Sequence, residues 1–290
     1  MRFRWDWLRP VVTAPYVPTI GPVHPSVLTE DLFADILRTA GTRRFLLYDK
    51  DLRWSDTKDE RVLAEDIAHR PGETLIPTLL ARGAGTVKVY AYGVEPASRI
   101  TAAELAQKLC VTHGADTARV VRFLGSEYAT RSARGTRIQL REFSGGPRPA
   151  AEPVVSAYAD LSVSGHRSFA TFGDTIGEDG FRFLFERMRV GAVGPVLLAV
   201  VDGRVAGAIC PMEIRHDAIG QPQLMPQYFG VLPERRGRGL GRALWRAAMR
   251  WGHDHGAAYQ LLQTEVGGAS DTLCQAEGLT SLGFVINAEA

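Results

Sequence analysis

Glycine and arginine alternate in one short segment near the C-terminal end of the chain. Residues 233–251 read Pro-Glu-Arg-Arg-Gly-Arg-Gly-Leu-Gly-Arg-Ala-Leu-Trp-Arg-Ala-Ala-Met-Arg-Trp. Glycine lets a backbone approach a ligand closely, and the helix predicted behind it begins with unpaired N–H groups and the positive end of its dipole. Arginine side chains add charge-assisted donors. These features predict a phosphate-binding loop, built by Arg236, Gly237, Arg238, Gly239 and Gly241.

The spacing of this loop separates it from two common phosphate-binding motifs. It is neither G-x-G-x-x-G with a later ribose-binding acid nor a Walker-type loop ending in G-K-[ST]. Residues 236–241 read R-x-x-G-x-G, and residues 231–244 as a whole resemble the acyl-CoA-binding motif of the GNAT acetyltransferase superfamily. The strand predicted before the loop and the helix predicted after it stand where that family has them.

The resemblance implies acetyl-CoA, or another acyl-CoA, as the cofactor. It implies that backbone amides around Phe229 and Val231 bond the acyl carbonyl and the pantetheine, while the loop holds the pyrophosphate. The residues that it assigns to the cofactor are Phe229, Gly230, Val231, Arg236, Gly237, Arg238, Gly239, Leu240, Gly241 and Arg242.

Direct transfer to an amine requires a base that reaches the amine itself or through one water. Glu213, at the end of a predicted hairpin strand, is one candidate, and Tyr228 is a candidate for base or acid. Alternation along the strand sends Tyr228 to the opposite side from Phe229, and the sequence leaves open which side faces the cleft. A solvated carboxylate and a core tyrosine are the alternative interpretations.

The segment after the next strand departs from the family pattern. The family has an approximate N-x-x-A-x-x-L-Y, whereas residues 267–274 read Gly-Gly-Ala-Ser-Asp-Thr-Leu-Cys. Cys274 therefore stands where the family often has the Tyr that protonates the departing thiolate. Its thiol could donate that proton or form an acyl adduct, or it could be a buried, inert cysteine. Placing Leu279 at the Tyr position instead leaves too few residues for the closing strand.

Hydrophobic patterning predicts the elements that position these residues. A strand from Pro195, a two-residue Asp202-Gly203 turn and a returning strand form a hairpin. The other elements expected from the pattern are a helix at 178–189, a strand at 227–232 and a helix ending near Trp251. The resemblance implies a strand at 257–263, a short helix after Gly267 and a last strand at 280–286.

The N-terminal part shows a weaker pattern and no chemical motif. Five prolines between residues 10 and 25 predict an extended arm. Beyond it we expect helices at 30–39 and 101–110 and strands at 44–48, 86–92 and 118–124. Gly and Pro at 144–153 indicate a linker. The expected domains are an arm at 1–26, an α/β domain at 27–143 and a GNAT-like domain at 150–290.

The expected fold class is therefore α/β (α+β): a GNAT-like mixed, mostly antiparallel sheet flanked by helices, with a second N-terminal α/β domain. That N-terminal domain could be a decayed second copy of the same fold or a domain that shapes the substrate site. The sequence leaves both open.

Composition bounds the function further. The chain has 290 residues, 45% of them apolar, and a net charge of +2, which disfavours nucleic acid and acidic membranes as partners. A stripe of Arg242, Arg246 and Arg250 could reach the 3′-phosphate of CoA or a polynucleotide, but a solvated face is the commoner meaning. No metal is expected, because His253-Asp254-His255 lies at a helix end where the dipole favours His.

The cysteines and the apolar runs indicate the compartment. Three widely spaced cysteines, Cys110, Cys210 and Cys274, show no C-x-x-C pattern and predict a reducing environment. We find no secretory signal and no run long enough for a membrane span, so a cytoplasmic location is expected.

Together these observations predict an acyl-CoA-dependent N-acyltransferase that moves acetyl to an amine of a small molecule by direct attack in a ternary complex. The alternative is an acyl-CoA-binding module or pseudoenzyme with a regulatory or carrier role. The departures at Gly267 and Cys274 motivate it. The oligomeric state, monomer or homodimer, stays open.

Overall fold

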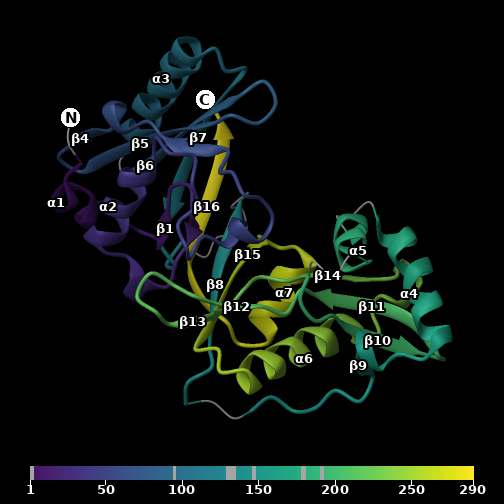
Figure 1. Ribbon diagram of the computed structural model, residues 1–290. Coiled ribbons are helices and arrows are strands. Elements are labelled where there is room, and N and C mark those ends of the chain that lie inside the picture. The colour runs from purple at the N-terminus through teal and green to yellow at the C-terminus, as the bar shows by residue number, and fades with distance from the viewer. Residues whose placement is uncertain (1–2, 94–95, 129–134, 146–147, 178–180, 190–192) are drawn as a thin grey trace. The chain divides into compact units, whose positions relative to one another are not determined.

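The computed structural model describes residues 3–93, 96–128, 135–145, 148–177, 181–189 and 193–290. The chain packs into two units (Figure 1). Unit 1 comprises Met1–Arg141, Asp217–Ile219 and Leu261–Ala290, and unit 2 comprises Glu142–His216 and Gly220–Gln260. Each unit therefore combines segments that are distant in the sequence. The domain boundaries expected from the sequence remain a prediction.

Long strands build the sheet of unit 1. Its strand order is β15-β8-β16-β7-β6-β5-β3, with β4 also paired to β5. The strands are β3 (Glu60–Val62), β4 (Ala68–Arg70), β5 (Glu73–Leu80), β6 (Thr86–Gly93), β7 (Thr117–Leu124), β8 (Thr136–Glu142), β15 (Tyr259–Glu265) and β16 (Thr280–Glu289). Strand β16 lies antiparallel between β7 and β8, so the last strand of the sequence is part of this sheet.

Helix α3 (Pro96–His113) connects β6 to β7, which are parallel, and covers one face of the sheet (Figure 1). A parallel pair requires such a crossover. Apolar side chains on alternate positions of the strands pack against the helix in one cluster, which includes Val87, Val89, Ala102, Ala106 and Val120.

The proline-rich segment packs on the other face of the same strands. Tyr90 and Tyr92, which alternate with the α3-facing residues, stack with Phe123, and the Tyr92 hydroxyl donates to the Tyr16 carbonyl at 2.8 Å. The segment has only short elements: α1 (Trp5–Leu8), η1 (Arg9–Val11), β1 (Tyr16–Val17), β2 (Gly21–Pro22) and η2 (Pro25–Val27), followed by α2 (Glu30–Thr39).

One N-terminal expectation is wrong, and one N-terminal strand was not predicted. Residues 44–48 are not a strand: they precede the 3-10 helix η3 (Lys50–Arg53), and Leu47 is 89% exposed, so the apolar run does not enter a core. Strand β5, which contains Pro77, was not predicted from the sequence. That proline is tolerated between the residues that pair with β4 and those that pair with β3.

Unit 2 is built around a four-stranded antiparallel sheet of order β14-β11-β10-β9. The predicted hairpin is confirmed, and Asp202 and Gly203 have φ of 52° and 71°, as a two-residue turn of this kind requires. The strand after the turn ends at Cys210, earlier than predicted, because Pro211 has no N–H to donate. The strands are β9 (Val155–Ala157), β10 (Leu197–Val201), β11 (Arg204–Cys210) and β14 (Tyr228–Val231).

Two shorter strands follow Pro211, where β11 has ended. Strand β12 (Ile214–His216) pairs with β13 (Pro222–Leu224), and β13 runs parallel to the start of β15, with Gln223 opposite Tyr259. A short stretch after β13, ending at Gln227, then leads into β14.

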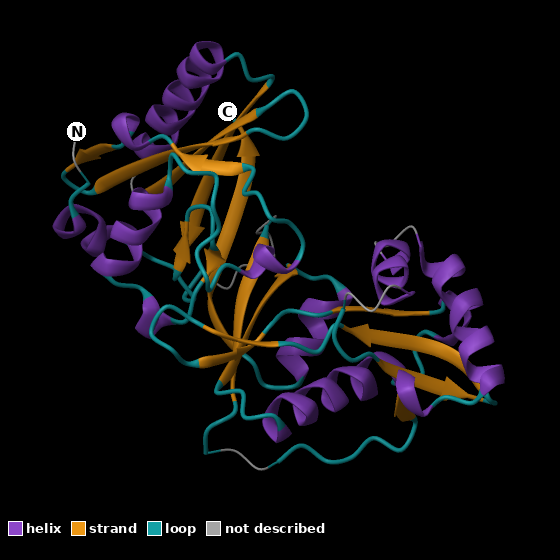
Figure 2. Ribbon diagram, in the orientation of Figure 1, coloured by secondary structure: helices purple, strands orange, loops and turns teal. Residues whose placement is uncertain are grey.

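Helices cover both faces of the four-stranded sheet (Figure 2). Helix α6 (Leu240–Asp254) lies on one face, where a Cβ built on Gly207 of β11 would be 3.0 Å from Leu244 Cδ1. Helix α4 (Val163–Ile176), with α5 (Phe181–Arg189), lies on the other, where a Cβ on Gly230 would be 3.1 Å from Ile176 Cγ2. Helix α4 was not predicted from the sequence.

The predicted fold class is confirmed: the larger sheet is mixed and mostly antiparallel, the four-stranded sheet is antiparallel, helices flank the sheets, and the N-terminal part is α/β. In the ranges that the structure describes, no helix is both long enough and apolar enough to span a membrane.

Candidate functional site

The glycine loop leads into α6 with a backbone that favours glycine. Gly237 and Gly239 have φ of 75° and 79°, and a Cβ built on either would have no heavy atom within 4 Å. Gly239 is the N-cap of α6, and no side chain caps the helix there. The first amides of α6 are therefore open to an acceptor from a ligand.

Two consecutive arginines before the loop have different roles. Arg235 is paired with Asp202 in the hairpin turn at 3.6 Å. Arg236 is exposed, and its Nε donates to the Val231 carbonyl at 3.1 Å, which fixes the side chain beside β14. Arg236 is therefore positioned for a ligand that lies along this strand and the loop.

The edge strand β14 directs two amides away from the sheet. The Leu232 amide donates to the Ala206 carbonyl at 2.9 Å, toward β11. Because N–H groups alternate along a strand, the amides of Phe229 and Val231 point to the other side. The hydrogen bond from Arg236 to the Val231 carbonyl supports this direction, because the N–H and C=O of one strand residue point to the same side of the strand. These are the two amides that the resemblance assigns to the cofactor.

The side chains of β14 alternate between the two helix layers. A Cβ built on Gly241 would lie 3.8 Å from Phe229 and 3.9 Å from Val231, so these side chains face α6. Tyr228 and Gly230 face the α4 layer. Tyr228 and Phe229 therefore lie in different helix layers.

Glu213 and Tyr228 lie at the same end of the β11–β14 pair. Tyr228 is opposite Cys210, and the Glu213 carbonyl accepts from the Met225 amide at 2.9 Å. The Glu213 carboxylate also accepts from Arg215 Nε at 2.6 Å, whereas Tyr228 is 47% exposed. A base at Glu213 would work beside a guanidinium.

Cys274 belongs to unit 1, on α7 (Ala269–Ala276), whereas the glycine loop belongs to unit 2. The residue is 2% exposed. Burial, with contributions from Asp271 and Glu277, raises the pKa of its thiol to about 11. The thiol therefore keeps its proton at neutral pH, which suits a proton donor or an inert cysteine better than a nucleophile.

We expect Cys274 to resist alkylation in the folded protein. Iodoacetamide reacts with the thiolate, and at pH 8 this buried thiol is almost entirely protonated. Mass spectrometry after native labelling should find Cys110, which is only partly buried, modified before Cys274. Labelling of Cys274 as fast as in urea would contradict the burial that we describe.

A buried carboxylate organises the segment where the family pattern is broken. Asp271 is fully buried and accepts from Arg137 Nε at 2.8 Å, Thr264 at 3.0 Å and Gln139 at 3.1 Å. The Gly267 amide also donates to it at 3.0 Å. Sequence reasoning missed Asp271, whose only local signal is an acid in the first turn of a helix.

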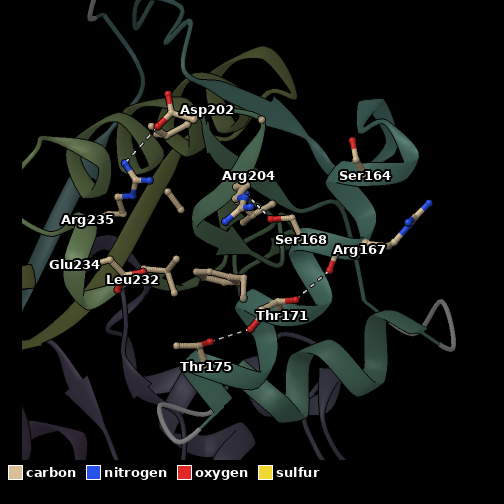
Figure 3. A pocket seen from close by; sticks show the side chains of 15 residues that line it. Ser164, Arg167, Ser168, Thr171, Thr175, Asp202, Arg204, Leu232, Glu234 and Arg235 are labelled. Atoms are coloured by element: carbon tan, nitrogen blue, oxygen red, sulfur yellow. Dashed lines mark hydrogen bonds and ion pairs between the residues drawn. The ribbon is translucent and has the colours of Figure 1, made fainter.

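A cavity of about 710 Å³ lies on the α4 side of the hairpin (Figure 3). Ser168 lines it and accepts from the Val205 amide at 2.9 Å, while Arg167 and Arg204 come from α4 and β11. The cavity is at the hairpin end of β11, away from Glu213 and Tyr228. Its lining, as far as the structure describes the chain, includes none of the residues predicted for catalysis or for the cofactor.

The arginine stripe of α6 is engaged in part within unit 2. Arg246 pairs with Glu152 at 3.9 Å, and Arg250 donates to the Pro149 carbonyl at 3.1 Å. Hydrogen bonding from Arg148 lowers the pKa of the neighbouring Asp254 to about 2. Arg246 and Arg250 thus contact Glu152 and Pro149 of the same unit.

Residues 166–271 match the acetyltransferase (GNAT) family. No curated protein matches the chain. Among solved structures, a GCN5-related N-acetyltransferase from Sphaerobacter thermophilus is 18% identical, with a TM-score of 0.46, over 83% of this chain and 84% of its own. A tandem GNAT protein from the clavulanic acid biosynthesis pathway is 13% identical, with a TM-score of 0.46, over 89% and 93%.

A GCN5-related N-acetyltransferase from Kribbella flavida is 15% identical, with a TM-score of 0.44, over 77% of this chain and 89% of its own. The function proposed below rests on the family match and on the residues of the site.

Proposed function

Residues 166–271 form a domain of the acetyltransferase (GNAT) family, and from this premise we propose that the protein is an acyl-CoA-dependent N-acyltransferase. It transfers acetyl from acetyl-CoA to an amine of a small molecule. The observation that carries the proposal is the continuity of the two outward amides of β14 with the open glycine loop at the start of α6.

The loop fits a pyrophosphate. Its left-handed glycines leave space where side chains would stand, and the amides at the start of α6 offer donors to phosphate oxygens. Arg236 and Arg238 add exposed guanidinium groups, and Arg242 follows in the first turn of the helix. Gly237, Gly239, Leu240 and Gly241 complete the set that would hold the phosphates.

The strand fits the acyl end. Acetyl-CoA, when bound, supplies a thioester carbonyl that an amine can attack. The outward amides of Phe229 and Val231 are fixed donors for such a carbonyl and for the pantetheine, with Gly230 between them. Fixed donors aimed at developing negative charge are an effective way to lower an acyl-transfer barrier.

Glu213 and Tyr228 are the candidates for removing the proton of the amine. They lie at one end of the β11–β14 pair, and Cys274 is the candidate donor to the departing thiolate. To choose between the first two, we would compare Glu213→Gln with Tyr228→Phe. The variant that lacks the base should lower kcat with no change in the Kd of acetyl-CoA.

A binding module without turnover is the second candidate function. Two observations favour it: the carboxylate of Glu213 is paired with Arg215, and Cys274 replaces the usual tyrosine. A protein of this kind would bind acetyl-CoA with the same loop and would release no CoA with any amine.

The test is a calorimetric titration of the full chain with acetyl-CoA, beside an Arg236→Glu, Gly239→Trp double variant. We expect micromolar binding that is lost in the variant. No binding by the wild-type protein would overturn the proposal. Amine-dependent release of CoA, followed with a thiol reagent, then separates the enzyme from the binding module.

A further inference from the structure

Unit 1 contains a cavity of about 690 Å³ at the carboxyl ends of β6 and β7. In sheets with parallel strands, this end beside a crossover helix is where ligands commonly bind. The apolar residues that line it on the α3 side of the sheet include Ala91, Ala103 and Leu124. No motif in the sequence pointed to it.

Two arginines line this cavity from different elements. Arg99 comes from the first turn of α3, and Arg122 comes from β7, opposite Ala91 of β6. Burial, followed by the charge of Arg99, lowers the pKa of Arg122. Both side chains thus line the same cavity, and Arg122 feels the positive charge of Arg99.

Neither guanidinium forms an ion pair with any residue in the described part of the chain, although Glu104 and Glu289 line the same cavity. Other basic side chains of unit 1 are paired: Arg137 with Asp271, and Lys88 with Glu60. These two arginines can therefore offer their guanidinium groups to an anion in the cavity.

We propose that this cavity binds an organic anion, a carboxylate or phosphate monoester that carries an apolar group. Arg99 and Arg122 hold the anionic group, with Gln107 and Tyr128 as further polar groups at the wall. The apolar part of the ligand lies on Ala103 and Leu124. All of these residues belong to unit 1, so the site does not rest on the proposed acyltransferase activity.

The proposal distinguishes a binding role of the arginines from a structural one. A structural arginine stabilises the folded protein, so its replacement lowers Tm. An arginine that serves to bind a ligand, and that lies near another positive charge, does not stabilise the folded protein. Its replacement should leave Tm equal or higher. Loss of binding together with unchanged or increased stability is therefore the expected signature.

The experiment is a calorimetric titration of the full chain with phenyl phosphate and with benzoate, and with benzyl alcohol as the neutral probe. We expect one anion to bind with a Kd below about 1 mM, and benzyl alcohol not to bind. A tighter phenyl phosphate assigns the site to phosphate esters, and a tighter benzoate assigns it to carboxylates. Arg99→Gln and Arg122→Gln should each weaken binding about tenfold or more.

The matched control is Arg204→Gln, which removes an exposed arginine from the cavity of unit 2 and should leave binding unchanged. Binding should also persist in Gly239→Val, which separates this site from the glycine loop. No binding of either anion at about 10 mM would overturn the proposal, as would equal binding by Arg122→Gln. A fall in Tm in both arginine variants with undiminished binding would assign them a structural role instead.

Discussion

Replacing Gly239 with valine is expected to weaken acetyl-CoA binding by about 100-fold or more. The new side chain would fill the open space beside the loop, where no heavy atom of the protein lies within 4 Å of a Cβ. It would keep a pyrophosphate away from the first amides of α6, and losing two charge-assisted hydrogen bonds costs about 3 kcal/mol. Calorimetry with acetyl-CoA measures the loss directly.

Gly220→Val is the matched control for this prediction. Gly220 also has a left-handed backbone, with φ of 82°, and also has nothing within 4 Å of a built Cβ. Both substitutions therefore place a branched side chain in a strained conformation, at about 1–2 kcal/mol each. We expect similar losses of stability, but loss of binding only at Gly239. Equal loss of binding in the two variants would contradict a direct role of the loop.

Replacing Asp271 with alanine is expected to lower the free energy of unfolding by about 3–5 kcal/mol, the range for breaking a buried ion pair. The side chain of Arg137, which is 12% exposed, would lose its partner at 2.8 Å. Thr264 and Gln139, both buried, would lose an acceptor as well. Urea denaturation followed by circular dichroism measures the change.

Asp254→Ala is the matched control, since Asp254 also pairs with an arginine, at 2.6 Å. The side chains of this pair are 53% and 29% exposed, so solvent screens the attraction and replaces the lost contacts. We expect little change in stability for this variant. A loss at Asp254 as large as the loss at Asp271 would show that burial is not the cause.

Asp271 should also shape the acid side of the stability profile. Burial alone would raise the pKa of its carboxyl, but hydrogen bonds from Arg137, the Gly267 amide and Thr264 lower it overall. Because the folded pKa lies below the unfolded value of about 3.9, the carboxylate contributes stability that is present above that pH. This stability is lost as the pH falls through the folded pKa.

Urea unfolding at a series of pH values tests this dependence with Asp271→Asn. The stability difference between wild type and variant should be largest near neutral pH and should shrink as the pH falls below about 4. A difference that stays constant across this range would contradict the assignment of the acid sensitivity to Asp271.

Features that depend on neighbours in the sequence were predictable. The Asp202-Gly203 hairpin turn and the helix at 30–39 each follow from a short pattern of residue types. The glycine loop also stands, as predicted, between a short strand and an amphipathic helix. Glycine's backbone freedom and the period of the apolar residues act locally, so the sequence alone determined these features.

Features that depend on pairing between distant segments were decided by the tertiary structure. The amides of Phe229 and Val231 point outward because the Leu232 amide bonds to β11. The same pairing register between β14 and β11 directs Tyr228 toward the α4 layer. Helix α4 itself was not predicted, so the cavity beside it was not foreseen.

The same holds in unit 1. Arg137 and Asp271 are 134 residues apart, and Arg99 and Arg122 lie on different elements around one cavity. Strand β16, at the end of the sequence, inserts between β7 and β8. Such contacts carry no local pattern, because their free energy arises only when folding has brought both partners out of water and into contact.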